Sequence, residues 1–453
     1  MGNYAYDYLN ESLLLDETLI NCHYKGISDT VLEKKLLNYR EYCLKILPDI
    51  RKNVKTNKEI IRCMATDSMS HISHLKRAAL YLEEAVVADP IFELTDFRTL
   101  ATEALASLID MKSTPKIDRQ KLANAATKLI ELRPLVVGNY IKLYPVSFEL
   151  ERGTEIPILY SDVGFEDCLP PNILKQYKSK ADVRRVENDN GRLLVMRDLT
   201  LCRHISVMFQ GMEEGYSMSY ILLPTEFEPT NKEGLYRVIH EKPPSEPPTR
   251  TEFIAWANQS INQSARAHFI DLNKRIALCD SLECLFATEH PFESDLLNMN
   301  INVSDISTNA LNCTLQMDVP FLEQVSSADL MSLRNNDGEA FQSFRAELEK
   351  GFREARYESD PNKVRSIIED TQHELFDVQM RQIAPQVKHL QKTHFTDASI
   401  ALAGLGLSVV TGGASLLATG IALAHGYKSH HDYKSKVTAN PCHFLWNVKQ
   451  KAR

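Results

Sequence analysis

The sequence lacks a C-x-x-C motif, and we expect no signal peptide at its start. Its nine cysteines form no C-x-x-C pair, which argues against a zinc ribbon and a thioredoxin-like site. Unpaired thiols of this kind are typical of a reducing compartment. The stretch Met1–Asp7 has neither the basic nor the apolar region of a signal peptide. We therefore expect a cytoplasmic protein, with a peripheral position at the inner face of a membrane left open.

An excess of basic residues is also missing. The chain has 453 residues, with 52 Lys and Arg against 60 Asp and Glu, which gives a net charge of −8. This balance argues against a nucleic-acid coat protein. Arg184, Arg185 and Arg192 nevertheless flank a predicted hairpin, and they leave an acidic protein or a nucleic acid open as partners of a local patch. A hydrophobic content of 43% excludes disorder over the whole chain.

The motifs of common enzyme classes are absent as well. The sequence contains no P-loop, no G-x-S-x-G elbow, no kinase catalytic loop and no H-E-x-x-H pair. His71 and His74 share a helix face but lack an acidic third ligand, so we expect no metal and no cofactor. One candidate catalytic group remains: Asp198, His204 and Glu213 would form an acid–base site if the strands around them brought them together.

Residues 1–134 show the apolar spacing of helices. A helix capped by Ser28 is expected to end at Pro48, and a longer one is expected from about Asn57 to Val86. Two further helical runs follow, at about 95–111 and 118–132. Short polar connectors between such runs are typical of a helical domain.

Residues 135–242 predict a mainly antiparallel β domain. Asn188-Asp189-Asn190-Gly191 separates two strand-like runs, and Asn and Gly tolerate the positive φ that a tight hairpin turn needs. Further strand candidates lie at 141–143, 148–150, 205–209, 219–223 and 236–240.

A proline-rich linker, 243–249, ends this domain, with four prolines in six residues. Thr249 and Glu252 then form a T-x-x-E capping box, and a long helix is expected to run to about Ile276. Residues 286–320 show no clear period, and helical spacing returns between Ser326 and Val378 within a predicted helical region, 250–395.

The most unusual segment is 398–427, which contains no Asp, Glu, Lys or Arg over 30 residues. It is rich in small residues that let helices approach closely, and its glycines include Gly404, Gly406, Gly412, Gly413 and Gly420. A basic tail with an aromatic residue follows, comprising Lys428, Lys434, Lys436, Trp446 and Lys449. Such residues are typical of the interface beside anionic headgroups.

Three interpretations of segment 398–427 remain open. It is long enough for one transmembrane helix. The basic tail after it would remain in the cytoplasm, however, so the roughly 400 residues before it would have to cross the membrane. A hairpin has arms of about 14 residues, too short for a bilayer core of about 30 Å, so it would be re-entrant or interfacial. The third interpretation is a helical hairpin packed inside the protein or an oligomer.

The sequence thus predicts a predominantly helical α+β protein. Its parts are a helical domain (1–134), an antiparallel β domain (135–242), the linker, a helical region (250–395), and a hydrophobic hairpin with its tail (396–453). We expect a non-enzymatic interaction or effector protein, such as a toxin or defence protein, that has a protein partner. Its hairpin would bind membrane lipid or drive self-association. The alternatives are a metal-dependent hydrolase or nuclease with a site in the β domain, and a soluble oligomeric scaffold.

Overall fold

A computed structural model defines two compact units. Unit 1 comprises residues 1–74 and 82–316, and unit 2 comprises residues 75–81 and 317–453. The structure describes residues 3–55, 62–65, 72–96, 117–150, 169–189, 192–196, 198–212, 217–231, 236–240, 244–299, 308, 311–312, 315, 322, 324–336, 338–351, 358, 361–375 and 441–451.

Unit 1 contains a parallel sheet, sheet A, in the strand order β10-β1-β2-β3. Its strands are β1 (Arg62–Ala65), β2 (Glu84–Ala88), β3 (Ile141–Tyr144) and β10 (Leu285–Ala287). β2 and β3 are buried along their whole length, which is typical of a parallel sheet covered on both faces. β10 pairs with β1 on the side away from β2, so the direction of strand addition reverses at β1.

Sheet A corrects the expected helix from Asn57 to Val86. The described part of that stretch contains β1, helix α4 (Ile72–Tyr81) and β2. The apolar residues of β1 and β2 are buried because parallel neighbours and covering helices enclose them. Apolar runs this short look the same in a buried strand and a buried helix, so their spacing misled the prediction.

Helices account for most of the other described residues among the first 150. They are α1 (Tyr4–Asn10), η1 (Leu13–Leu15), α2 (Glu17–Asn21), α3 (Asp29–Lys55), η2 (Phe92–Thr95), α6 (Arg119–Glu131), α7 (Arg133–Val137) and α8 (Val146–Leu150). The predicted cap of α6 is confirmed, since Asp118 accepts the Lys121 N–H at 3.0 Å.

Two boundary predictions in this region are wrong. α3 continues through Pro48 to Lys55, because Ile50 and Val54 bury apolar surface beyond the proline and stabilise the last two turns. Residues 148–150 form part of helix α8 and not a strand. The predicted strand at 141–143 exists as β3, but it belongs to the parallel sheet.

The antiparallel sheet, sheet B, has the order β5-β4-β6-β7 and confirms the predicted hairpin. Its strands are β4 (Ala181–Asp189), β5 (Arg192–Val195), β6 (His204–Phe209) and β7 (Met218–Ile221). Asp189 pairs with Arg192 across the turn. A separate pair is formed by β8 (Thr225–Pro229) and β9 (Tyr236–His240), the latter as predicted.

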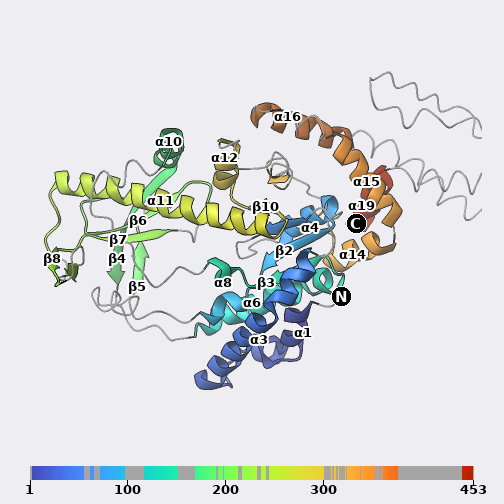
Figure 1. The fold of residues 1–453 in the computed structure, drawn as a ribbon, viewed down its shortest axis with the longest axis horizontal. Helices are drawn as coiled ribbons and strands as arrows, with labels where there is room; N and C mark the ends of the chain where they lie inside the picture. The colour runs from blue at the N-terminus through green and yellow to red at the C-terminus, as the bar shows by residue number, and fades with distance from the viewer. Residues whose placement is uncertain are drawn as a thin grey trace, which may run out of the picture. The chain divides into compact units, whose positions relative to one another are not determined.

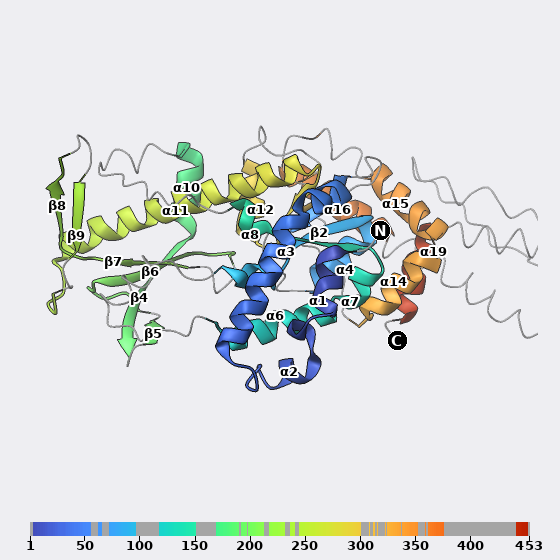
Figure 2. The ribbon, with the colours of Figure 1, turned by 60° about the horizontal axis from the view of Figure 1, so that its bottom comes forward.

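Two helices cover one face of sheet B. α10 (Pro171–Lys180) and α11 (Arg250–Ser281) lie on the side to which Ile205, Val207 and Phe209 of β6 point (Figure 1). The predicted capping box of α11 is confirmed, since Thr249 and Glu252 exchange hydrogen bonds of 2.9 and 3.3 Å. α11 contacts β4 and β6 of sheet B and also β10 of sheet A, so one helix runs past both sheets (Figure 2).

Unit 2 is helical. Its helices are α14 (Ser327–Asn336), α15 (Gly338–Gly351), α16 (Pro361–Gln372) and α19 (Pro441–Lys451). The glycines of segment 398–427 and Lys428, Lys434 and Lys436 lie outside the described residues. Within the described part of the chain, no helix has the length and hydropathy needed to cross a bilayer.

Candidate functional site

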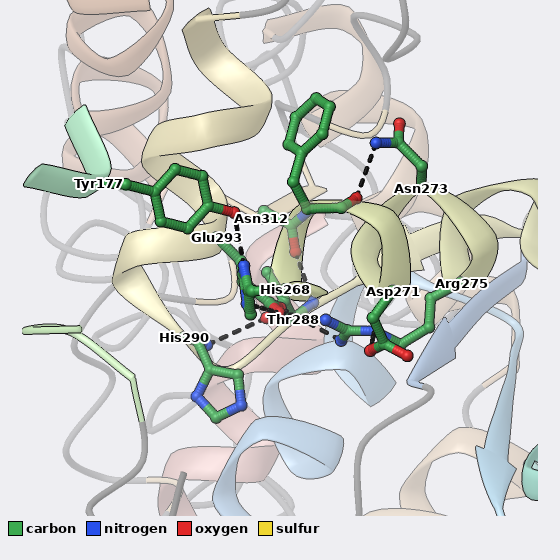
Figure 3. Close-up of polar contacts among 10 residues, drawn as sticks. Tyr177, His268, Asp271, Asn273, Arg275, Thr288, His290, Glu293 and Asn312 are labelled. Atoms are coloured by element: carbon green, nitrogen blue, oxygen red, sulfur yellow. Dashed lines mark hydrogen bonds and ion pairs between the residues drawn. The ribbon is translucent and has the colours of Figure 1, made fainter. Parts of the chain in front are cut away.

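A buried polar network lies where β10 ends, and its side chains converge from three helices and the strand end (Figure 3). Tyr177 comes from α10, His268 and Arg275 come from α11, and Glu293 lies in the first turn of α12 (Pro291–Met299). All four side chains are buried. In an open sheet of parallel strands, the carboxyl ends at the point where the strand order reverses are the usual place for polar side chains and ligands.

Glu293 is the centre of the network. One of its oxygens, Oε1, lies 3.1 Å from His268 Nε2, and Arg275 forms an ion pair with the same oxygen. Because an ionised carboxylate only accepts, Nε2 carries a proton. In a neutral imidazole, Nδ1 then accepts from the Tyr177 hydroxyl, which lies 2.6 Å away. A continuous chain of hydrogen bonds therefore links the phenol, the imidazole, the carboxylate and the guanidinium.

The second oxygen of Glu293 fixes the end of β10. Thr288 follows the strand directly, and its hydroxyl donates to Glu293 Oε2 at 2.5 Å. The Thr288 N–H donates to Asn312 Oδ1 at 2.9 Å, and Asn312 Nδ2 donates to the Phe286 carbonyl at 2.8 Å. The Thr288 hydroxyl oxygen also accepts the His290 N–H at 3.1 Å. The network therefore holds the backbone on both sides of Thr288.

The electrostatics keep Glu293 ionised. Burial by itself raises the pKa of this carboxyl, but the Arg275 charge and the hydrogen bond from His268 outweigh it and hold the pKa well below its usual range. Asp271 Oδ2 lies 3.0 Å from Arg275 Nε and adds a second carboxylate to the guanidinium. Glu293 and His268 expose no side-chain surface. These two groups therefore hold the surrounding helices and strand end in place and are not accessible from solvent.

A second buried carboxylate group lies at the end of β2. Asp89 follows the strand, accepts the Ile91 and Phe92 N–H groups at 2.9 and 3.0 Å, and accepts the Tyr39 hydroxyl. Glu93 accepts the Ser147 N–H at 3.0 Å. Burial raises the pKa of Asp89 and raises that of Glu93 to about 7.

The residues predicted for catalysis lie elsewhere, around sheet B. Asp198 is exposed, and Arg185 holds it at 3.2 Å. His204 lies on β6, and burial lowers its pKa. Glu213 lies outside the described residues, so the three-residue group stays a prediction. Among the described residues, no cluster of three or more His, Cys, Asp or Glu side chains could hold a metal ion.

The predicted arginine patch lies on the hairpin, with its charges partly compensated. Arg184 forms an ion pair with Asp182 at 2.7 Å, and Arg185 pairs with Glu187 as well as with Asp198. Arg192 begins β5.

The sequence analysis missed the buried network, although one signal was available. His268 and Arg275 are seven residues apart on α11, on the same stripe as the buried Leu272 and Cys279. Polar residues on an apolar stripe need buried partners. Nothing local in the sequence identifies Glu293 as that partner, because it comes from another helix.

Unit 2 brings together the helices that precede and follow segment 398–427. α15 contacts both α16 and α19. The aromatic rings of Phe341 and Phe344 on α15 lie 5.1 and 6.0 Å from that of Phe444 on α19. Lys451 at the end of α19 lies 3.2 Å from Asp329 on α14. The chain therefore leaves from α16 and, after residues 376–440, returns to α15, the helix that α16 also contacts.

Comparison of the chain with models of protein families, with curated proteins and with solved structures finds no match.

Proposed function

We propose that the protein is a non-enzymatic interaction or effector protein that binds the inner face of a membrane. Segment 398–427 inserts as an out-and-back hairpin, unit 2 holds both of its ends, and unit 1 binds a protein partner. The uncharged segment followed by a basic tail is the observation that carries this proposal.

The packing of α19 on α15 supports an excursion that begins and ends on one side. A single crossing would place α19 across the bilayer from α15, and the buried contacts of Phe444 could not then form. An out-and-back path keeps them. Each arm would have about 14 residues and a helical length of about 21 Å, short of the roughly 30 Å hydrocarbon core. The hairpin would therefore enter one leaflet without crossing.

The charges around the segment support attachment to the inner face of the membrane. Lys428, Lys434 and Lys436 follow the uncharged run, and Lys449 is exposed on α19. Lysines near a membrane surface are attracted by anionic headgroups, each by about 1 kcal/mol.

Unit 1 favours a binding role over the alternative of a hydrolase or nuclease. At the centre of its most developed polar network, Glu293 and His268 expose no side-chain surface. Asp198, a candidate for catalysis, is engaged by an arginine. Loss of a metal-dependent activity in His204→Ala, with the fold intact, would support the alternative.

The test is flotation of the full chain with vesicles of neutral lipid and of neutral lipid plus phosphatidylserine. We expect the protein to float with the anionic vesicles. Val410→Glu with Leu417→Glu places two charges in the uncharged segment and should weaken binding by roughly tenfold or more, equivalent to about 1.4 kcal/mol. The matched control is Val137→Glu, which places a charge at a side chain that is already 72% exposed.

The membrane proposal would be contradicted if the wild-type chain failed to float. It would also be contradicted if the doubly charged variant floated as well as the wild type. If the wild type does not float and the doubly charged variant changes the mass of the particle in solution, segment 398–427 is an assembly element and the protein is a scaffold.

A further inference from the structure

The strand order of sheet A marks one position for a ligand. When the strands are numbered by their order in the chain, they lie in the order 3-2-1-4, because β10 is added on the far side of β1 from β2. The first four strands of doubly wound folds have this same order. In those folds, nucleotides bind outside the carboxyl ends of the strands at which the order reverses. The equivalent position here lies between the ends of β1 and β10.

Two side chains meet at this position. His74 lies in the first turn of α4, the helix that follows β1, and Glu289 lies two residues after the end of β10. Both residues belong to unit 1. His74 Nδ1 is 3.4 Å from Glu289 Oε1, and the two side chains are 20% and 16% exposed. The pair therefore joins the two strand ends and is neither sealed from solvent nor fully exposed to it.

The buried network around Thr288 holds Glu289 in place. The Thr288 N–H donates to Asn312. The Thr288 hydroxyl donates to Glu293 and accepts the His290 N–H. Glu289 thus lies between two residues whose backbone is anchored. Such support favours a binding site, because less conformational entropy is lost when a ligand binds to groups that are already positioned.

The chemistry of the pair fits a diol. A carboxylate accepts hydrogen bonds, and an imidazole beside it can donate or accept. Hydroxyl groups on neighbouring carbon atoms, as in ribose, can each reach one member of such a pair, and a carboxylate binds ribose in doubly wound folds. Asp89, at the end of β2, is only 1% exposed and already accepts two N–H groups and the Tyr39 hydroxyl. Glu289 is therefore the more accessible acceptor.

We propose that unit 1 binds a ribonucleotide between the carboxyl ends of β1 and β10, with the ribose hydroxyls on Glu289 and His74. Strand order alone does not establish a ligand, and the contact between these two side chains supplies the chemistry. The ligand is bound without chemical change. This activity adds a small-molecule site to the membrane and partner binding proposed above.

The test is calorimetric titration of the full chain with the four common ribonucleoside monophosphates and with the dideoxy analogue of each, which lacks both ribose hydroxyls. We expect at least one ribonucleotide to bind. Its dideoxy analogue should bind roughly tenfold more weakly or worse, because a site that hydrogen-bonds hydroxyl groups rejects a ligand without them. Glu289→Gln should weaken binding of the ribonucleotide by about the same factor. The matched control is Glu228→Gln, at a carboxylate on β8 that is 54% exposed.

The comparison of the two sugars uses the wild-type chain, so it decides the question even if Glu289→Gln fails to fold, which urea unfolding would show. The proposal is overturned if none of the four ribonucleotides binds. It is also overturned if a dideoxy analogue binds as tightly as its ribonucleotide, or if folded Glu289→Gln binds like the wild type. An equal loss of binding in Glu228→Gln would likewise remove the assignment to Glu289.

Discussion

Two buried carboxylate groups in unit 1 lie at the carboxyl ends of strands in the same parallel sheet, and their electrostatics are opposite. At the end of β10, Glu293 is paired with Arg275 and its pKa lies well below the usual range. At the end of β2, Asp89 and Glu93 are held by hydroxyl and backbone N–H groups, and their pKa values are raised. Burial acts in the same direction on all three carboxyls.

The difference shows what a buried carboxylate needs in order to stay ionised. Neutral donors stabilise the charge of Asp89 and Glu93 but do not offset the loss of water. A guanidinium in direct contact does offset it at Glu293. Glu293 and Arg275 at the end of β10 therefore form a permanent ion pair that stabilises the fold. Glu93, by contrast, titrates near neutral pH. Three sets of variants test this difference between the two groups.

The largest effect is expected from removing the Arg275 charge. Arg275→Met leaves Glu293 buried without its guanidinium and should lower the free energy of unfolding by about 3–5 kcal/mol near neutral pH. Because the folded pKa of Glu293 is depressed, the pair contributes fully above the ordinary pKa of 4.5, and its contribution is lost as the pH falls through the folded value. Urea unfolding between pH 3 and 7 measures both effects.

A matched control for this variant is Arg237→Met. Arg237 is 74% exposed and lies 3.7 Å from Glu228, so its loss should change stability by less than about 1 kcal/mol. If Arg275→Met is no more destabilising than Arg237→Met, the network does not depend on the ion pair. Adding Glu293→Gln to Arg275→Met should recover part of the loss, because it removes the unpaired charge.

A smaller effect of opposite sign is expected at Glu93. Its folded pKa of about 7 lies above the ordinary 4.5, so the folded state loses stability as the pH rises between these values. Glu93→Gln keeps an oxygen that accepts the Ser147 N–H and removes the charge. The variant should be more stable than the wild type by about 3 kcal/mol at pH 8 and by much less at pH 4.5. If the free energies of unfolding of the wild type and of Glu93→Gln changed with pH in parallel, Glu93 would have an ordinary pKa.

The smallest effects are expected from the two tyrosines that donate to these groups. Tyr177→Phe removes the hydroxyl beside His268 and should cost about 1 kcal/mol at pH 5 and at pH 8. Tyr39→Phe removes a bond that lowers the pKa of Asp89, so its cost should exceed that of Tyr177→Phe and grow as the pH rises. If the loss of unfolding free energy depended on pH equally in Tyr177→Phe and Tyr39→Phe, the two carboxylate groups would not differ in their electrostatics.

Much of the local structure followed from the sequence because its causes are local. The turn before Arg192, the cap at Asp118 and the box formed by Thr249 and Glu252 depend on residues within a few positions. The buried network did not follow, since Tyr177, His268 and Glu293 come from three helices that only folding brings together.

The sequence by itself determined the α+β class, the hairpin of sheet B and the long α11, because alternation, turn residues and caps act between near neighbours. The tertiary structure alone decided that β1, β2 and β3 form a parallel sheet with β10. It also decided that α19 returns to α15. Parallel pairing and helix docking join segments far apart in the chain, and their stability comes from shared burial that no local pattern records.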